Sequence, residues 1–348
     1  MKILYGFNGV GNGHIARARI MVPKLRAAGA DVTCILSGRD ADPNLDVGQE
    51  GEIIFKDGLR LENKDGKMQF FSTSLGLAKD LPQLAYDALK LDIDEYDLII
   101  TDFEPVSAWA AKLKGKPSIG LANHFSLFHD NVPKVGEFSP FMLFMKNIVP
   151  ADTKLGMHWD SFDEPILPPL FSAPEAKPAD PNKILVYLNF ENLDHVTSLL
   201  ENIEGYEFYI YSGKVQQSST KDNLHYRPLS VDGFKKDFAD CAGIIANAGF
   251  QTTSEALQLG KKNFVKPLEG QKEQESNVLA LEQLNLASTM DELDPEAVRK
   301  WLARDDFNKV RYPDVAQAVT QWVMSGDIED PQPMIDEIWS KVDYQPAP

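Results

Sequence analysis

The chain has few of the features that mark secreted or membrane proteins. It contains only two cysteines in 348 residues, Cys34 and Cys241, which lie far apart, so we expect buried thiols in a reducing compartment rather than a disulfide framework. No apolar run approaches the roughly 18 residues that a membrane-spanning helix needs. The first residues, MKILYGF, lead directly into a strand, so we expect no signal peptide. These absences predict a cytoplasmic protein.

Basic residues are also scarce. The chain has 35 lysines and arginines against 52 aspartates and glutamates, which gives a formal net charge of −17. Nucleic acids select basic surfaces, so this charge argues against a nucleic acid as the main partner. It also opposes broad attraction to anionic lipids, although a local basic patch remains compatible with it.

The sequence does contain a regular alternation of strand-like apolar runs and helix-like stretches, which is typical of parallel α/β layers. In the first half we predict strands at 2–7, 31–37, 52–56, 97–102 and 117–123, and helices at 14–28 and 75–91. In the second half we predict strands at 183–188, 207–212, 224–229, 243–247 and 263–267, and helices at 192–203 and 251–259. The length exceeds one comfortable hydrophobic core, so we expect two such domains.

A segment rich in proline and small residues, at 164–181, separates the two halves and is typical of a linker. We therefore place an N-terminal domain at 1–163 and a C-terminal domain at 182–312. The tail at 313–348 carries two more helical stretches, which could cross back to the first domain. Two facing α/β domains place a cleft outside the carboxyl ends of their strands, where such sheets bind ligands.

The first strand opens into a turn with three glycines, Gly9, Gly11 and Gly13, followed by His14. The G-x-G-x-x-A spacing formally fits a dinucleotide site, but that fold also needs an acidic residue at the end of the second strand. This strand ends at Ser37, followed by glycine and arginine, so the dinucleotide interpretation is weak. The glycines instead let an acceptor substrate approach the backbone beside the histidine.

His14 is our candidate general base, because a neutral imidazole can take a proton near neutral pH. The alternative is a histidine that only starts a helix or sits in the core. Asp102 ends a strand of the same domain and could orient the imidazole. It could equally cap the helix that begins near Pro105. His124, also at a strand end, is a second candidate for base or acceptor binding.

A second turn follows the strand at 243–247 and points to a diphosphate linked to hydroxyl-rich groups. Here we expect exposed amides and hydroxyls to bind the phosphates, a carboxylate to bind the ribose, and amide side chains to bind the sugar. The alternative is a capped helix with a solvated loop. The residues of this set are Asn247, Ala248, Gly249, Thr252, Thr253, Ser254, Glu255, Gln271, Glu273 and Gln274.

Five segments, taken in order, resemble a bacterial and archaeal family of predicted glycosyltransferases with the GT-B fold. They are Tyr5–Arg17, Asp97–Glu104, Ile184–Glu191, Ala248–Lys261 and Gly270–Asn277. The wider clade includes the N-acetylglucosaminyltransferase of peptidoglycan assembly and UDP-glucuronosyltransferase-like enzymes. The resemblance implies an α/β protein with two Rossmann-like domains facing across a cleft. It is specific for this fold and for nucleotide-sugar transfer, but not for the sugar or the acceptor.

The resemblance also assigns roles to single residues. Glu255 would bind the donor ribose, Gln271 and Gln274 would bind the donor sugar with Glu273 nearby, and Leu229 and Ser230 would lie beside the nucleobase. The amides of Ala248 and Gly249 would hold the diphosphate. His14, the loop Gly9–Gly13 and His124 would face the acceptor. Many relatives have histidine at the position of Asn247, so either altered donor affinity or an inactive protein is implied here.

The expected reaction is an inverting, metal-independent transfer from a nucleotide sugar, with a UDP-sugar favoured and no cofactor. The acceptor is less defined. The apolar run at 138–150, flanked by Lys134 and Lys146, is either a membrane-facing lip for a lipid or cell-envelope acceptor or an ordinary buried helix. Two other functions are compatible with the fold, a nucleotide-sugar 2-epimerase and a nucleotide-sugar-binding pseudoenzyme.

Overall fold

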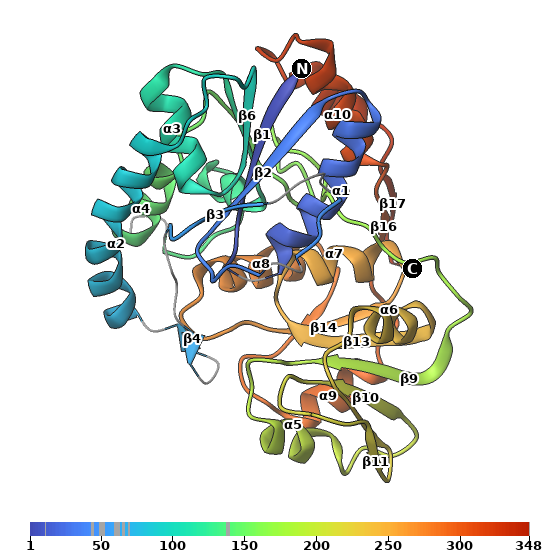
Figure 1. Cartoon of the computed structure of the whole chain (residues 1–348). Coiled ribbons are helices and arrows are strands. Elements are labelled where there is room, and N and C mark those ends of the chain that lie inside the picture. The colour runs from blue at the N-terminus through green and yellow to red at the C-terminus, as the bar shows by residue number, and fades with distance from the viewer. Residues whose placement is uncertain are drawn as a thin grey trace.

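The protein consists of two α/β domains stacked one above the other, with a C-terminal tail that runs along both (Figure 1). The computed structural model describes residues 1–10, 12–42, 45–48, 53–58, 63–64, 67–68, 70–136 and 140–347. In this described part, the N-terminal domain holds a six-stranded sheet and the C-terminal domain a seven-stranded sheet. The predicted α/β class with two Rossmann-like domains is confirmed.

The N-terminal sheet has the strand order β3-β2-β1-β6-β7-β8, and its strands pair in parallel. The strands are β1 (Lys2–Asn8), β2 (Asp31–Ser37), β3 (Ile54–Lys56), β6 (Leu98–Asp102), β7 (Ser118–Leu121) and β8 (Thr153–Leu155), with a separate short pair of β4 (Asn63–Lys64) and β5 (Lys67–Met68). The helices are α1 (Gly13–Ala27), α2 (Phe70–Lys90), α3 (Pro105–Lys114), the 3₁₀ helix η1 (Asn123–Phe128) and α4 (Pro140–Ile148).

Both faces of this sheet are buried, which explains the nearly continuous apolar sequence of its strands. Alternate residues of β1 point to opposite faces. Ile3 and Tyr5 belong to the core shared with α1, whereas Leu4 belongs to the core shared with α2 and α3. In Figure 1, α1 accordingly lies on one side of the sheet, and α2, α3 and α4 lie on the other.

The C-terminal sheet has the order β11-β12-β10-β9-β13-β14-β15, parallel except for the β11–β12 pair. Its strands are β9 (Asp180–Tyr187), β10 (Glu207–Tyr211), β11 (Ser219–Lys221), β12 (Leu224–Arg227), β13 (Cys241–Asn247), β14 (Lys262–Lys266) and β15 (Ser288–Thr289). Its helices are α5 (Leu193–Leu200), α6 (Val231–Asp240), α7 (Phe250–Gln258), α8 (Lys272–Gln283) and α9 (Pro295–Leu302).

The segment at 164–181 begins as packed chain rather than loose chain, since Ile166, Leu167 and Leu170 are buried. Beyond the second domain the tail forms β16 (Lys309–Arg311), α10 (Val315–Ser325), α11 (Gln332–Trp339) and β17 (Asp343–Gln345). Helix α10 packs against α1 of the first domain, where Lys24 pairs with Asp314 at 2.8 Å. The tail therefore ties the two domains together (Figure 1).

Several contacts join the facing edges of the domains. The Trp159 indole N–H donates to the Ser254 hydroxyl at 2.9 Å, and the Val135 amide donates to the Ser276 hydroxyl at 3.1 Å. A Cβ built on Gly13, at the start of α1, would lie 3.9 Å from the Cβ of Gln251 in α7. The N-termini of α1 and α7 therefore approach each other across the domain boundary.

Candidate active site

A cleft of about 570 Å³ lies between the two domains. Its walls come from the loops after β1, β6 and β7 on one side and after β9, β13 and β14 on the other. These are the carboxyl ends of parallel strands, as expected for a ligand site in open α/β sheets. Of the predicted site residues, the cleft is lined by Gly9, Gly13, His14, His124, Gly249, Thr252, Gln271, Glu273 and Gln274.

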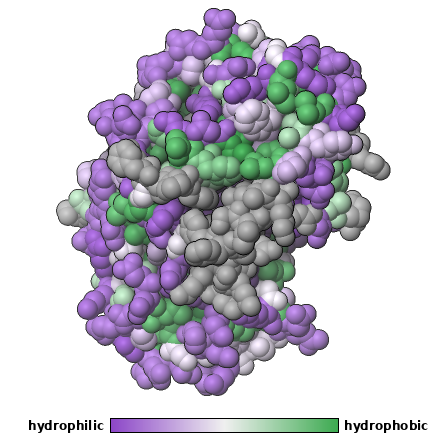
Figure 2. Space-filling model, turned by 90° about the vertical axis from the view of Figure 1, so that its left-hand side faces the viewer, coloured by the Kyte–Doolittle hydropathy of each residue, from purple (hydrophilic) through white to green (hydrophobic). Residues whose placement is uncertain are grey.

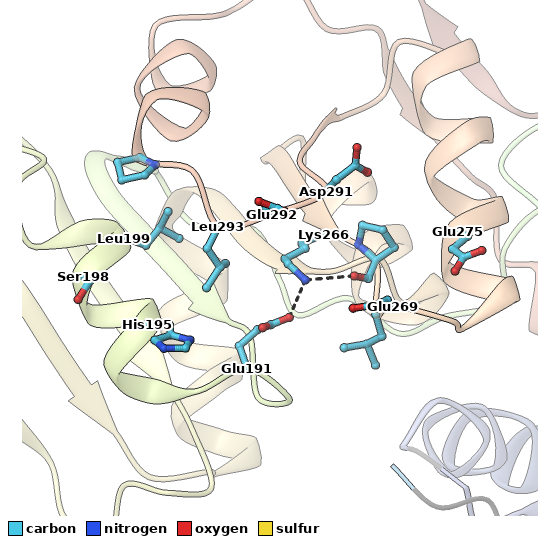
Figure 3. Close-up of a pocket in the computed structure, with 13 residues that line it drawn as sticks. Glu191, His195, Ser198, Leu199, Lys266, Glu269, Glu275, Asp291, Glu292 and Leu293 are labelled. Atoms are coloured by element: carbon cyan, nitrogen blue, oxygen red, sulfur yellow. Dashed lines mark hydrogen bonds and ion pairs between the residues drawn. The ribbon is translucent and has the colours of Figure 1, made fainter. Parts of the chain in front are cut away.

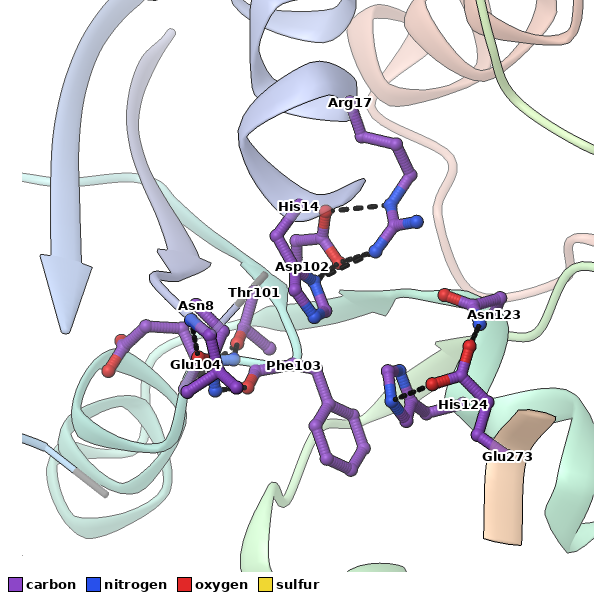
Figure 4. A network of polar contacts seen from close by, with 11 residues as sticks. Asn8, His14, Arg17, Thr101, Asp102, Phe103, Glu104, Asn123, His124 and Glu273 are labelled. Carbon is purple, nitrogen blue, oxygen red and sulfur yellow. Dashed lines mark hydrogen bonds and ion pairs between the residues drawn. The ribbon is translucent and has the colours of Figure 1, made fainter. Parts of the chain in front are cut away.

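The structure brings His14 and Asp102 together at the wall of this cleft (Figure 4). The His14 Nδ1 lies 2.7 Å from the Asp102 Oδ1. A third residue completes the cluster, because Arg17 donates from Nε to Oδ2 at 2.8 Å and from Nη2 to Oδ1 at 2.7 Å. All three side chains are buried. The sequence reasoning did not single out Arg17, although it lies one helical turn after His14, on the same face of α1.

The charges of this cluster define the state of the histidine. Burial by itself raises the pKa of the Asp102 carboxyl, but Arg17 and His14 outweigh burial and lower it, so Asp102 is ionised. Nδ1 lies 2.7 Å from Asp102 Oδ1, which only accepts, and 2.8 Å from Arg17 Nη2, which only donates. The carboxylate contact favours the tautomer with hydrogen on Nδ1 and a lone pair on Nε2. Burial lowers the pKa of the His14 imidazole more than Asp102 raises it, so the ring is neutral at neutral pH. A neutral ring with a free Nε2 at the cleft can accept a proton.

Asp102 does not cap the helix after it. The N-cap of α3 is Glu104, whose carboxylate accepts from the amides of Val106 and Ser107, each at 2.7 Å. Between the two carboxylates, Phe103 adopts a left-handed φ of 53°, which is strained for a residue with a large side chain. This turn lets Asp102 point toward His14 while Glu104 points into α3, which separates the two roles that the sequence left open.

His124 belongs to a second cluster, which spans the domain boundary (Figure 4). Its ring stacks on His14 with centroids 5.5 Å apart and on Phe103 with centroids 4.5 Å apart. Its Nε2 lies 3.1 Å from Glu273, which also accepts from the Asn123 amide at 2.7 Å. Burial alone raises the pKa of Glu273, but His124 and the Asn123 amide lower it to about 2. Glu273 of the C-terminal domain thus contacts the N-terminal domain.

The turn after β13 differs in part from the expectation. Helix α7 begins at Phe250 with Gly249 as N-cap, so the amides without a helical partner are those of residues 250–252. The expected exposure of the Thr253 and Ser254 hydroxyls is wrong. Both side chains are buried because they lie on the inner face of α7, and the Ser254 hydroxyl donates to the Phe250 carbonyl at 2.7 Å.

The other residues expected to contact phosphate are placed as follows. Ala248 is fully buried and its amide donates to the Lys266 carbonyl at 3.0 Å, so this amide is already paired. The Asn247 side chain also donates to the Lys266 carbonyl, at 3.3 Å, and Asn247 does not line the cleft. Thr252 and Gly249 do line it, and nothing lies within 4 Å of a Cβ built on Gly249. The Gly249 amide, however, donates to the Asn247 carbonyl at 2.7 Å, so it too is already paired and the expectation that it binds the diphosphate is wrong. The open part of the turn is therefore 249–252.

Among the amide and carboxylate side chains of the second motif, Gln271, Glu273 and Gln274 line the cleft, whereas Glu255 does not. The Glu255 carboxylate accepts from the side-chain Nε2 of Gln251 at 3.0 Å, and burial raises the pKa of Glu255 to about 7. Gln274 accepts from the Leu268 amide at 3.0 Å and so fixes the loop before α8. In contrast, the Oε1 atoms of Gln251 and Gln271 are buried without a partner in the described part of the chain. Gln251 is a further cleft residue that the sequence reasoning missed.

The remaining predicted residues lie farther out or outside the description. Leu229 is 49% exposed, and Ser230 caps α6 by accepting from the Gly233 amide at 3.1 Å. A Cβ on Gly9 would meet the Arg39 side chain at 2.5 Å, so the space beside this glycine is already filled. Gly11 lies outside the described residues.

Helix α4 supplies an apolar wall to the cleft. Its residues Met142, Phe144, Met145 and Ile148 line the cleft together with Phe103 and Phe128. This segment is the apolar run predicted at 138–150, of which residues 138 and 139 lie outside the described part. In the described part, no helix is long and apolar enough to cross a membrane.

A second cavity, of about 760 Å³, lies in the C-terminal domain between α5, the end of β14 and the loop before α9 (Figure 3). An ion pair of 2.9 Å between Lys266 and Glu191 crosses it. Its other charged lining residues are mainly acidic, among them Asp291 and Glu292. None of the predicted donor or acceptor residues lines this cavity.

The fold is similar to that of several solved glycosyltransferases. The spinosyn rhamnosyltransferase SpnG has a TM-score of 0.61 and 14% identity, over 97% of this chain and 100% of that chain. MurG of Acinetobacter baumannii has a TM-score of 0.56 and 16% identity, over 93% and 99%. UGT2 of Phytolacca americana, complexed with UDP-2fluoro-glucose and pterostilbene, has a TM-score of 0.58 and 13% identity, over 98% of both chains.

At these identities the structural likeness shows the GT-B fold alone. A search of curated proteins found no match. The family comparison goes further, because the model of glycosyl transferase family 1 matches residues 1–305, which include both domains and the whole cleft. The chain is therefore a glycosyltransferase and belongs to glycosyl transferase family 1.

Proposed function

We propose that the protein transfers a sugar, without a metal and with inversion, from a nucleoside diphosphate, UDP favoured, to an acceptor hydroxyl in the cleft. One observation carries this proposal. Three buried polar atoms that lack partners in the described part belong to residues that line the cleft together with His14: Gln251 Oε1, Gln271 Oε1 and His124 Nδ1. An unpaired buried polar atom costs about 1–3 kcal/mol, so a hydroxyl-rich ligand would offset these costs.

The donor diphosphate fits at the open turn 249–252. Three free amides at the start of α7 point their partial positive charge toward the cleft, and an anion is stabilised there. The start of α1 approaches the same place from the other domain. Two helix N-termini would therefore bind the leaving diphosphate in place of a metal. The UDP preference draws support from UGT2, a protein of the same fold that is complexed with a UDP-sugar analogue.

In the proposed reaction, the acceptor oxygen attacks the anomeric carbon from the face opposite the diphosphate. The new carbon–oxygen bond forms as the bond to the diphosphate breaks, and the electron pair leaves with the phosphate oxygen. The acceptor proton moves to His14 Nε2, and the imidazolium is stabilised by Asp102. The proton is then released to solvent.

A panel of nucleotides and nucleotide sugars, screened by thermal shift and followed by product analysis, tests this function. We expect a nucleotide sugar to raise Tm. At a free ligand concentration of 100 Kd, binding should add about 2.7 kcal/mol to the free energy of unfolding. Incubation with an acceptor should release a nucleoside diphosphate and form a glycoside, with or without EDTA. Loss of transfer in EDTA would refute metal independence. If the product is an epimerised nucleotide sugar, the protein is a 2-epimerase. If the protein binds a nucleotide sugar but shows no turnover with any acceptor, it is a pseudoenzyme.

Donor affinity should rise with pH because of Glu255. The pKa of this carboxyl is raised to about 7 in the free protein, and only its ionised form accepts from both ribose hydroxyls. The ionised fraction increases about tenfold between pH 6 and pH 8, and the donor Kd should fall by up to the same factor. Isothermal titration calorimetry with the donor at several pH values measures this Kd. The Glu255→Gln variant, which does not ionise, should bind weakly with a flat pH profile; a wild-type Kd in this variant would refute the ribose role.

For the acceptor we propose a hydroxyl on a molecule that also has an apolar part, as in a lipid or a lipid-linked cell-envelope glycan. The wall formed by Met142, Phe144, Met145 and Ile148 would contact its apolar part, while its hydroxyl reaches His14. Burying such a group contributes about 25 cal/mol per Å² of apolar surface. A fully polar acceptor would leave this wall unused.

The outer side of α4 has the properties of a membrane-binding surface, which we include in the proposal. Leu143 is 65% exposed there, and the face of the molecule that carries α2 and α4 shows hydrophobic side chains among hydrophilic ones (Figure 2). Burial, and then the charges of Lys146 and Lys112, lower the pKa of Lys154, so these three lysines lie close together. The Lys154 ammonium donates to the Lys146 carbonyl at 3.3 Å. Lys134, expected to flank the surface, is instead bound to backbone carbonyls.

Liposome flotation tests this surface. The wild-type protein should float with vesicles that contain anionic phospholipid and not with neutral vesicles, because each lysine near an anionic surface contributes about 1 kcal/mol. The variant Leu143→Glu/Lys146→Glu should bind at least tenfold more weakly. The control Leu279→Glu/Lys221→Glu makes the same exchanges on the C-terminal domain and should float like the wild type. Absence of wild-type binding to every lipid mixture would count against the surface.

A further inference from the structure

Arg17 is the residue of the catalytic cluster that the proposed reaction does not yet use. It is 2% exposed, and its guanidinium binds both oxygens of Asp102, which is fully buried. Its Nη2 also lies 2.8 Å from His14 Nδ1, so three charged or polar groups meet in one place. A buried arginine beside a histidine that must accept a proton needs an explanation, because a cation opposes a second positive charge.

The two-pronged contact restricts Asp102 more than one hydrogen bond would. Arginine presents its donors in a planar fork that fits a carboxylate, so both oxygens and the carboxylate plane are fixed. Oδ1 is thereby held 2.7 Å from His14 Nδ1. The ionised carboxylate can only accept and the guanidinium can only donate, so Asp102 favours hydrogen on Nδ1 and Arg17 Nη2 opposes it. Because Nη2 also donates to Oδ1 at 2.7 Å, we assign its hydrogen bond to the carboxylate and the hydrogen on Nδ1 to the contact with Oδ1.

The same contact balances charge. The groups that face His14 are Asp102 from β6, Arg17 from α1, His124 from η1 and Glu273 from α8, and Tyr5 of β1 lies near Asp102 and Arg17. Without Arg17, the full negative charge of Asp102 would stabilise an imidazolium before any substrate is bound. With Arg17, the pair is neutral and burial keeps the ring unprotonated.

We propose that Arg17 is a positioning residue. It fixes the Asp102 carboxylate against His14 and balances the negative charge of Asp102. In the resting protein the His14 ring is therefore the neutral Nδ1–H tautomer with Nε2 free. The role rests on the proposed function of His14 as the base. Arg17 makes His14 a weaker base, but a weaker base is fully unprotonated at neutral pH, whereas a stronger one would be partly protonated before the acceptor binds.

Nitrogen-15 NMR of the imidazole rings tests this role in the resting protein. The chain has six histidines, and the spectrum of the His14→Gln variant identifies the signal of His14. In the wild type we expect the Nδ1–H tautomer and a titration midpoint below the ordinary value of about 6.5. An Nε2–H tautomer, or a midpoint at or above 6.5, would overturn the proposal without any Arg17 variant.

The variant Arg17→Met should raise the His14 midpoint by about 1–3 units, and Arg17→Lys, which keeps the charge but not the fork, by less. The control Arg19→Met removes an exposed arginine from the same helix and should leave the midpoint unchanged. The acid limb of kcat/KM should move with the midpoint. A folded Arg17 variant with an unshifted midpoint would refute the charge role. The NMR measurement needs no substrate. If the Arg17 variants shift the His14 midpoint as expected but the protein transfers no sugar, the proposed function is rejected while the effect of Arg17 on His14 stands.

Discussion

Replacing His14 by alanine should lower kcat by about 10²–10⁴-fold, the range that a general base typically contributes. The physical reason is that Nε2 is the unprotonated nitrogen at the cleft, while Nδ1 is bound to Asp102. Donor affinity should stay near the wild-type value, because alanine keeps the backbone amides at the start of α1 and the proposed donor-binding side chains lie in the other domain. Steady-state kinetics with the identified donor and acceptor, together with donor Kd, measure both quantities.

The matched control is His195→Ala. This histidine is exposed, belongs to α5 and lines the second cavity rather than the cleft, so kcat should not change. Unchanged turnover in His14→Ala would remove His14 from the reaction. His124 would then be the next candidate, because it stacks on His14 and has an unpaired Nδ1 in the described structure.

Asp102→Asn should damage both activity and stability. An amide nitrogen facing His14 would donate to Nδ1 and favour the tautomer with hydrogen on Nε2, which cannot accept the acceptor proton. The exchange also leaves Arg17 buried without its carboxylate, and such losses typically cost about 3–5 kcal/mol. We therefore expect a fall in kcat comparable to that of His14→Ala, together with a lower free energy of unfolding.

Urea unfolding of wild type and variant measures the stability part. The pKa of Asp102 is lowered in the folded protein, so its contribution is present above its ordinary pKa of about 3.9 and is lost as pH falls below it. The difference between wild type and Asp102→Asn should accordingly shrink in acid. Asp97→Asn, at an exposed position just before β6, is the control and should cost less than about 1 kcal/mol. An equally small loss in Asp102→Asn would contradict the buried ion pair.

Much of the fold could be predicted because the periodic signals were strong. The buried parallel strands appear as short apolar runs, and β1 and β2 match the predicted strands within one residue at each end. Helix α7 was harder. It begins at Phe250, close to the predicted start, but Thr253 and Ser254 lie on its buried face. Which face of a helix is buried depends on what packs against it, and the position of its first residue does not indicate that.

The site was predictable in its residue types but not in its pairings. The sequence indicates His14 and Asp102 because each follows a strand of the same parallel sheet, and carboxyl ends of such strands share one edge. It does not indicate that Glu273, about 150 positions after His124, reaches the N-terminal domain. Nor does it distinguish Asp102 from Glu104 as helix cap, since both are acidic residues before α3.

The sequence alone therefore determined the two α/β domains, the position of the cleft and the chemical classes of its residues. These properties follow from local periodicity, turn residues and the order of strands along the chain. Only the tertiary structure decided that Arg17 binds Asp102, that Glu273 joins His124 and that α4 faces the cleft. Such contacts depend on how two domains and their helices pack, and packing brings together residues whose separation in the sequence carries no signal.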